Sequence, residues 1–234
     1  MTEPKTIQWK RLAVEAAAIV ISILMAFWID AWWQDRSDQM RLNEYLSQVR
    51  ADTLDNQHRL KEALKLEKVQ LAAVQEILVA LRSSVPITLD SAREWAQLEP
   101  GFLWYSDPRL LDGAITALVA TGDINLVQNP RVKASLISYL GQLKADWNEF
   151  DRNVSQYLIH KDELLRVFER ARIPGTESAK DALANEFLSI QNDKTAAVVF
   201  RLLERNLTGR IWYLEQILAA TEVLSSQLNT QSDG

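Results

Sequence analysis

Two carboxylates at the edges of an apolar run are the residues whose placement most suggests chemistry. The run extends from Leu12 to Ile29 and reads LAVEAAAIVISILMAFWI, with Glu15 as its only ionisable side chain, and Asp30 follows directly. A carboxylate in the hydrocarbon of a bilayer is costly unless it faces protein, water or a partner. The two acids are therefore expected to serve either association with another helix or the handling of ions.

The two carboxylates share one side of a helix with three small residues, if each residue turns the helix by about 100°. The small residues are Ala18, Ser22 and Ala26. Small residues four positions apart let two helices approach closely. We therefore expect this association stripe to contact copies of itself or another membrane subunit. The alternative is that Glu15 pairs with Arg11, that Asp30 is interfacial, and that the alanines are coincidental.

A histidine between two acids is the second arrangement that could do chemistry. His58 has Asp55 three residues before it and Glu62 four residues after it, so that all three would share a helix face. Such a trio could hold a metal ion if a second helix supplied further ligands. Charged runs on long helices are more often solvated faces, and that alternative is favoured. The other histidine, His160, is a weaker case.

Sequence motifs of known catalytic chemistry are absent. The chain has no cysteine, which excludes disulfides, thiolate zinc sites and cysteine nucleophiles. It contains no G-x-S-x-G, Walker-type loop, G-x-G-x-x-G or H-E-x-x-H motif. We therefore predict no catalytic, cofactor-binding or metal-binding residues, no cofactor and no enzymatic activity.

Four aromatic residues gather where the pattern of the chain is least regular. They are Trp95, Phe102, Trp104 and Tyr105. Aromatic side chains on connecting segments often form a patch for a partner or a ligand. The favoured alternative is that they close one end of a helical bundle as a small core, since large aromatic side chains are usually buried.

The apolar run has the length and the flanks of a transmembrane helix. Between Trp9 and Trp32 a helix that rises about 1.5 Å per residue covers about 35 Å, which is the hydrocarbon core plus part of each interface. Tryptophans at both ends match the aromatic belts at the headgroup level. These belt residues are Trp9, Trp28, Trp32 and Trp33. A cleaved signal peptide is disfavoured because small residues are missing before a cut.

Basic residues near the ends of the span predict its orientation. Lys5, Lys10 and Arg11 precede the span, whereas the arginines that follow it are spread among acids. Because basic residues favour the cytoplasmic side, we expect the N-terminus in the cytoplasm and the C-terminal body in the periplasm, anchored in a bacterial inner (cytoplasmic) membrane. The chain has a net charge of −5 and no basic stripe, so nucleic acid is not an expected partner.

The scarcity of chain-breaking residues indicates which elements must position these side chains. The chain has 7 glycines and 6 prolines, with no proline between Pro4 and Pro86 and no glycine before Gly101. β-Folds need turn residues at about every tenth position, so an all-α fold is predicted. One continuous helix is expected from about residue 8 to residue 83, which joins the span to a long stalk.

Apolar residues keep heptad spacing through the expected stalk. The seam consists of Leu42, Leu46, Val49, Leu60, Leu64, Leu71, Val74, Leu78 and Leu81. Thr53 and Asn56 occupy the intervening seam positions and predict a soft point near residues 52–57. A helix with such a seam needs one or two partner helices along its apolar stripe.

Beyond residue 83 the breakers divide the chain into further helices. A short helix is expected over 90–98, followed by a turn at Glu99-Pro100-Gly101. Asp107-Pro108 is typical of a helix start, and that helix would stop at Thr121-Gly122. The remaining helices are expected over 130–172, 177–190 and 194–229.

Together these elements predict an all-α protein in which an N-terminal transmembrane helix continues into a long amphipathic stalk and an elongated antiparallel helical bundle. The expected parts are a cytoplasmic N-terminus over 1–11, a transmembrane helix over 12–33, a stalk over 34–83, a bundle over 84–230 and a frayed tail over 231–234. Long helices with narrow apolar stripes often bury their remaining apolar surface between subunits, so a homo-oligomer is expected.

Several features near the start of the chain follow one another in a specific order: a glutamate, an apolar stretch with a Leu-x-Ala-like element, an acid, tryptophans and a polar segment with an arginine. In this chain they are Glu15, Leu24, Ala26, Asp30, Trp32-Trp33 and Gln34-Asp35-Arg36. This order resembles an uncharacterised family of bacterial single-span membrane proteins, a domain of unknown function.

A second similarity to that family is a step between two helices. It spans Thr121-Gly122-Asp123-Ile124-Asn125-Leu126-Val127, followed by Asn129, Leu136 and Tyr139. The glycine that the family carries in the middle of its span is replaced here by alanine and serine. The resemblance implies a bacterial membrane-anchored α-helical protein, and it supplies no catalytic residues.

The anchor, the association stripe and the stalk predict a non-enzymatic protein that acts in assembly, as a scaffold, tether or accessory subunit. The expected partners are the lipid bilayer and either further copies of the chain or another membrane subunit. The alternative is an oligomeric ion channel or stator-like transport subunit that uses Glu15 and Asp30. Against it, both carboxylates lie towards the ends of the span, and the apolar middle would block ions.

Overall fold

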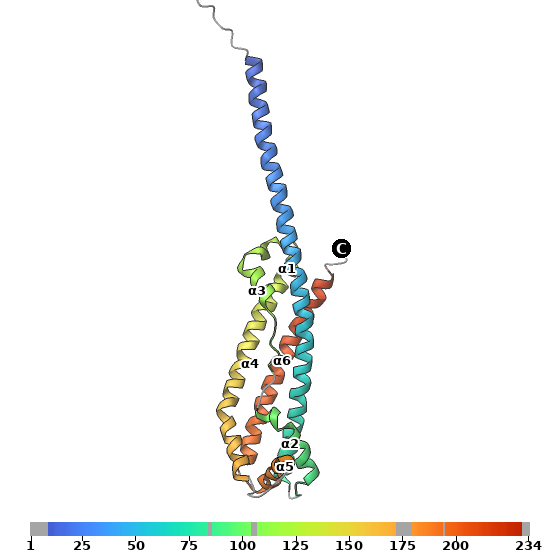
Figure 1. Ribbon diagram of the computed structural model, residues 1–234, viewed down its shortest axis with the longest axis vertical. Coiled ribbons are helices and arrows are strands. Elements are labelled where there is room, and N and C mark those ends of the chain that lie inside the picture. The colour runs from blue at the N-terminus through green and yellow to red at the C-terminus, as the bar shows by residue number, and fades with distance from the viewer. Residues whose placement is uncertain (1–8, 84–85, 104–106, 172–178, 194, 231–234) are drawn as a thin grey trace, which may run out of the picture.

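The chain is helical apart from short connections. The computed structural model describes residues 9–83, 86–103, 107–171, 179–193 and 195–230, and these ranges contain no strand. The predicted all-α fold is therefore confirmed (Figure 1).

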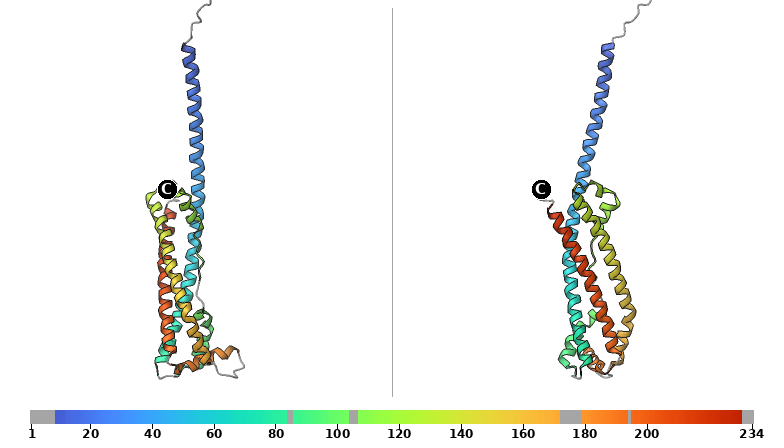
Figure 2. Two further views of the ribbon diagram at one scale, coloured as in Figure 1. Left: turned by 90° about the vertical axis from the view of Figure 1, so that its left-hand side faces the viewer. Right: turned by 180° about the vertical axis from the view of Figure 1, so that it is seen from behind.

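Three long helices form the body of the molecule. α1 (Trp9–Arg82) and α4 (Pro130–Ala171) run in the same direction, and α6 (Ala196–Thr230) runs antiparallel to both and packs against both. The first part of α1 projects far beyond the other two helices as a free rod (Figure 2). The body is consequently an elongated bundle at one end of a helix that continues without a break.

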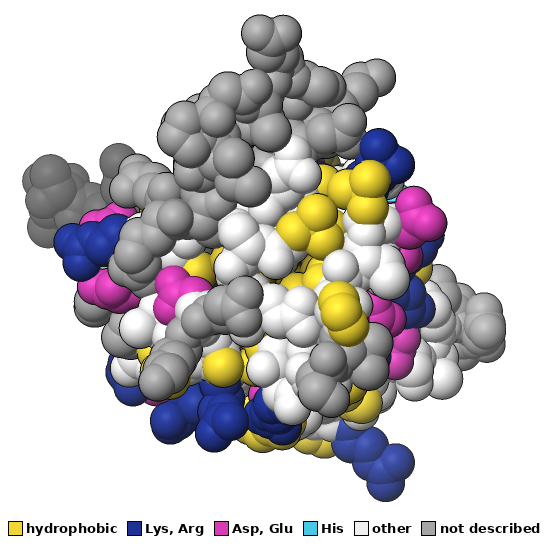
Figure 3. Space-filling view, turned by 90° about the horizontal axis from the view of Figure 1, so that it is seen from below, with side chains coloured by type: hydrophobic (Ala, Val, Ile, Leu, Met, Phe, Trp, Pro, Cys, Tyr) yellow, Lys and Arg dark blue, Asp and Glu magenta, His cyan; other side chains and the backbone are white. Residues whose placement is uncertain are grey.

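Shorter helices close the two ends of this body (Figure 1). α3 (Gly113–Ala120) and the 3-10 helix η1 (Asp123–Leu126) lie at the end nearer the free rod. At the far end lie α2 (Leu89–Leu103), α5 (Ala179–Ser189) and the 3-10 helix η2 (Ile190–Asn192). Seen from below, the far end has Lys and Arg side chains along the lower edge and, next to acidic side chains, at the left and right, with hydrophobic side chains scattered between them (Figure 3).

The heptad seam predicted for the stalk is the face of α1 that the bundle covers. Leu46, Val49, Leu60, Leu64, Val74 and Leu78 are buried, and Leu42, Leu71 and Leu81 are partly buried against them. Each fully buried leucine or valine contributes about 1.5–3 kcal/mol relative to exposure. The stalk is therefore part of the bundle, because its seam packs along α6.

The soft point predicted at residues 52–57 is not found. Thr53 and Asn56 are buried within the seam, and each has hydrogen-bond partners. The Thr53 hydroxyl donates to the Val49 carbonyl oxygen at 2.5 Å. Asn56 binds the extended segment before α3, donating to the Leu111 carbonyl oxygen at 2.8 Å and accepting from its N–H at 2.7 Å. These buried polar positions do not weaken the helix, because their polar groups are satisfied. The two hydrogen bonds between Asn56 and Leu111 are called the Asn56 clamp below.

The expected helix start at Asp107-Pro108 is also wrong, since α3 begins only at Gly113. The Asp107 carboxylate accepts from the Arg109 N–H at 2.9 Å, two residues on, which makes a turn rather than a helix cap. Arg109 then has a positive φ of 45°, and the Asn56 clamp holds Leu111 extended. The contact with Asn56 therefore keeps residues 107–112 out of the helix.

The turn expected at Glu99-Pro100-Gly101 lies inside α2, which continues to Leu103. Proline within a helix removes one backbone hydrogen bond and disfavours the helix, and α2 ends three residues after Pro100. The other predicted helices agree with α4, α5 and α6 to within a few residues. Gly141 does not interrupt α4.

Candidate functional site

The projecting part of α1 is an apolar surface with no protein against it. Among the described residues, α1 is the one helix with the length and apolarity to cross a membrane, and none of its most apolar window is buried. Exposed large side chains include Leu12, Ile19, Ile23 and Phe27. A core helix of a water-soluble domain would have such residues covered, whereas this segment is long and apolar enough to span a membrane.

The association stripe lies wholly on this free surface. Glu15, Ala18, Ser22, Ala26 and Asp30 are all exposed. The Ser22 hydroxyl donates to the Ala18 carbonyl oxygen at 2.8 Å, so its proton is already satisfied within the helix. A neighbouring helix would therefore meet a nearly flat surface of small side chains, with a carboxylate at each end.

The stripe and the bundle lie on opposite sides of α1. Val49 and Leu60, which face the core, follow Ser22 by 27 and 38 positions along one unbroken helix. At about 100° per residue both point roughly half a turn away from Ser22. The bundle therefore does not obstruct a second helix that approaches the stripe.

The predicted tryptophan belt is exposed at both ends of the apolar segment. Trp9, Trp28, Trp32 and Trp33 all have large exposed surfaces, and the rings of Trp32 and Trp33 lie 6.5 Å apart. The seam contacts begin at Leu42, so a neck over residues 34–41 separates the last belt residue from the bundle. Arg41 ends this neck, with ion pairs to Asp38 at 2.7 Å and to Asp123 of η1 at 3.2 Å.

A buried ion pair between α1 and α6 is a feature that the sequence analysis missed. Arg210 donates from Nε and Nη2 to the same carboxylate oxygen of Glu67, at 3.0 and 2.6 Å, and both side chains have 0% exposure. The Arg210 guanidinium also lies over the ring of Tyr157, 5.5 Å from its centre. The available signal was that Glu67 falls on the heptad seam, between Leu64 and Leu71.

Amide side chains extend this polar layer to α4. Arg210 Nη1 donates to the Asn206 side-chain oxygen at 3.1 Å. The Asn206 amide in turn donates to the Asn153 carbonyl oxygen at 2.7 Å and to the Asn153 side-chain oxygen. All three long helices are thus joined at one level by Glu67, Arg210, Asn206 and Asn153.

A second polar layer lies nearer the free rod. Besides holding Leu111, the Asn56 amide lies 3.4 Å from the Tyr139 hydroxyl oxygen, to which it donates. Burial raises the pKa of Tyr139 above its ordinary value, whereas side-chain hydrogen bonds with Thr221 and Asn56 act in the opposite direction. This layer also joins α1, α4 and α6, because Tyr139 is in α4 and Thr221 in α6.

Of the four residues of the predicted partner patch, Trp95 is the one whose side chain the structure describes, and it is buried. Trp95 is only 4% exposed, its ring packs edge-on against Phe187 at 5.9 Å, and its N–H donates to Glu76 at 3.3 Å. Trp95 is therefore part of the core at the far end of the bundle. The Phe102 side chain, Trp104 and Tyr105 lie outside the described residues.

The histidine trio is not arranged as a metal site. Asp55 is bound to Arg59 at 2.7 Å, and His58 is exposed. Within the part of the chain that the structure describes, no group of three or more acids and histidines could hold an ion. The side chain of His160 lies outside the described residues.

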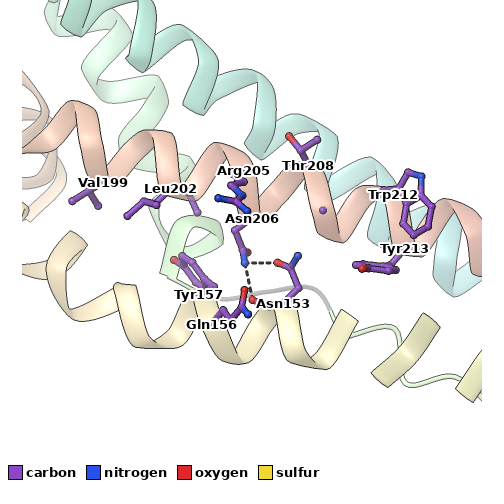
Figure 4. A pocket seen from close by; sticks show the side chains of 12 residues that line it. Asn153, Gln156, Tyr157, Val199, Leu202, Arg205, Asn206, Thr208, Trp212 and Tyr213 are labelled. Atoms are coloured by element: carbon purple, nitrogen blue, oxygen red, sulfur yellow. Dashed lines mark hydrogen bonds between the residues drawn. The ribbon is translucent and has the colours of Figure 1, made fainter. Parts of the chain in front are cut away.

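A groove between α4 and α6 was not anticipated from the sequence. It has a volume of about 540 Å³, and its lining combines amides with aromatic side chains, of which Trp212 is exposed (Figure 4). Gly209 is among the lining residues, and a Cβ there would run into the Asn153 side-chain amide. The lining includes Asn153, Gln156, Arg205, Asn206, Trp212 and Tyr213.

Comparisons with protein-family models, curated proteins and solved structures find no match. The features described above therefore have to be interpreted from their own geometry.

Proposed function

We propose that the protein is a non-enzymatic, single-span membrane anchor whose helical bundle serves in assembly, as a scaffold or accessory subunit. The chain associates with copies of itself through the association stripe. The observation that carries this proposal is the exposed apolar segment of α1, in which the stripe points away from the bundle. A carboxylate within a bilayer is costly unless it faces protein, water or a partner, and this favours a partner helix at the Asp30 end of the stripe.

The proposed setting is a bacterial inner membrane, with the N-terminus in the cytoplasm and the bundle in the periplasm. It is supported by the basic residues before the span, and by the resemblance of the first 55 residues to bacterial single-span proteins of unknown function. The poor cleavage site after the apolar run supports retention of the anchor.

Bulky substitutions on the stripe test self-association. The double variant Ser22→Leu/Ala26→Leu should reduce dimers and higher oligomers in liposomes by about tenfold or more, because leucine keeps the helix backbones apart. The measurement is FRET between separately labelled copies at increasing lipid dilution. Ala16→Leu/Ala17→Leu is the matched control, since it adds the same side chains outside the stripe. A monomer at every dilution, or equal effects of both variants, would refute the proposal.

Single cysteines test the orientation, because the natural chain has none. In intact bacterial spheroplasts, a membrane-impermeant maleimide should label Asp38→Cys and leave Thr2→Cys unlabelled until the cells are lysed. The reverse pattern would place the bundle in the cytoplasm.

A channel or stator-like transport subunit is the alternative, with Glu15 and Asp30 on one exposed side of α1. It predicts ion flux into liposomes that is reduced in Glu15→Gln and Asp30→Asn. Absent flux, or identical flux in all three proteins, would exclude the channel and leave assembly.

A further inference from the structure

The outer face of α6 combines a hollow, an exposed aromatic side chain and two arginines that have no acidic partner among the described residues. Trp212 is 52% exposed although it sits in the middle of a bundle helix, and its ring meets Tyr213 edge-on at 4.8 Å. Gly209, almost one turn earlier, also lines the hollow, and the Asn153 side chain packs against it. Exposed aromatic side chains beside a concave surface are typical of binding sites.

The positive charge at this groove comes from two arginines of α6. Arg205 lines the groove, and Arg201 lies one turn before it on the same helix. Neither arginine has an acidic partner among the residues that the structure describes, whereas Glu149 on α4 is paired with Arg152 at 2.8 Å. In a chain of net charge −5, this end of the groove is locally complementary to an anion.

The remaining polar groups are mostly amides. Asn153, Gln156 and Asn206 border the groove from α4 and α6 (Figure 4). The Asn206 amide is already bound to Asn153 and Arg210, so Gln156 is the amide that a ligand would meet. An amide offers both donors and an acceptor in one plane, which suits neighbouring hydroxyl groups that both donate and accept. Two helical turns separate Arg205 from Trp212, about 10 Å along the axis, which is the length of one or two sugar rings.

We propose that the α4–α6 groove binds an acidic oligosaccharide. One sugar ring lies with its apolar C–H face on Trp212, its carboxylate is bound by Arg205, and its hydroxyl groups are bound by the amide of Gln156. The site is separate from the association stripe, so the assembly proposal does not depend on it.

The test uses the full chain in lipid nanodiscs and isothermal titration with tetragalacturonate. We expect binding with a Kd of about 1 mM or tighter, and about tenfold weaker binding in Trp212→Ala and in Arg205→Gln. Val223→Ala and Arg131→Gln are matched controls, because both residues are exposed and lie outside the groove. Circular dichroism of each variant checks that the fold is retained.

Two further probes separate a sugar site from a site for any anion or any sugar. Neutral galactotetraose lacks the carboxylates, and tetraglutamate has carboxylates without sugar rings; each should bind at least about tenfold more weakly than tetragalacturonate. Equal binding of either probe would overturn the proposal. No binding of tetragalacturonate at millimolar concentration, or binding unchanged in both groove variants, would overturn it as well.

Discussion

Glu67 and Arg210 show how single residues set the packing of this bundle. Both are fully buried charges on facing seams of α1 and α6, where leucines would otherwise meet. A buried pair stabilises little relative to apolar residues of similar size, but loss of one partner leaves an unpaired charge in the core. Because Arg210 is also bound by Asn206, sliding α6 past α1 would break several interactions at once.

Glu67→Leu should lower the free energy of unfolding by about 3–5 kcal/mol, since Arg210 would remain buried without its carboxylate. The double variant Glu67→Leu/Arg210→Met should lose much less, because it removes both charges. Urea unfolding of the full chain in detergent, followed by near-ultraviolet circular dichroism, measures both values. A double variant as unstable as the single one would contradict this account of the pair.

The Asn56 clamp predicts a second local effect. Asn56→Ala should cost about 1–3 kcal/mol, because the N–H and carbonyl oxygen of Leu111 lose the buried Asn56 side chain as their partner. His58→Ala, on the exposed side of the same turn, should leave stability within about 0.5 kcal/mol. Thermal unfolding of the full chain compares the two. Equal losses would show that the segment before α3 is held by other contacts.

Tyr139 predicts a pH dependence in the alkaline range. Its pKa is raised in the folded state by burial, so above about pH 10 the unfolded chain releases the proton first. This contribution is complete below pH 10 and is lost as the pH rises through the folded-state pKa. The unfolding free energy should therefore fall less steeply above pH 10 in Tyr139→Phe than in the natural chain. Parallel pH profiles from urea titrations would contradict the prediction.

At the scale of elements, the glycines have opposite roles in two helices. Gly141 lies in α4 with nothing within 4 Å of an added Cβ, whereas a Cβ at Gly209 of α6 would run into the Asn153 amide. In the first helix glycine only adds flexibility to the unfolded chain. In the second it permits close contact between α4 and α6.

Gly141→Ala should therefore raise the free energy of unfolding by about 0.5–1 kcal/mol. Gly209→Ala should lower it by about 1–3 kcal/mol through overpacking. Adding Asn153→Ala to Gly209→Ala should recover part of the loss beyond additivity, because it removes the obstructing amide. Denaturant unfolding of the single and double variants gives this coupling. An additive result would show that the close approach carries no cost.

The helices and the seam of α1 followed from local pattern, because the scarcity of glycine and proline and the heptad spacing are properties of neighbouring residues. The errors at 52–57 and at Asp107-Pro108 have one common cause. Asn56 and Leu111 are far apart in the chain, and local pattern cannot show that they pair. This pairing stabilises the predicted soft point at residues 52–57 and keeps the segment before α3 out of the helix.

Among the candidate sites, too, some follow from local pattern and one depends on contacts between distant parts of the chain. The association stripe and the tryptophan belt depend on the period of one helix, so they could be placed in advance. The α4–α6 groove depends on which faces of two distant helices meet. The sequence contains Gly209 and Trp212 but does not show that Asn153 lies opposite them.

At the scale of the whole molecule, one unbroken helix joins the apolar segment to the bundle. From Trp33 to Val79, α1 covers about 70 Å at about 1.5 Å per residue, and the neck over 34–41 carries no seam contacts. In a membrane-anchored protein such a rod would hold the far end of the bundle at a fixed height. In such a protein the neck would determine the distance and the tilt of the bundle relative to the bilayer.

Ser37→Pro tests the rod, because proline in the neck removes one helical hydrogen bond and kinks the helix. The midpoint of bundle unfolding should change little, since Ser37 lies before the first seam residue. A dye on Val79→Cys, which is exposed, should show little energy transfer to an acceptor on the nanodisc surface and clearly more in the proline variant. Ser37→Ala is the control, as it keeps the helix. Equal transfer in all three proteins would mean that contacts of the bundle with the membrane, rather than the rod, determine its height.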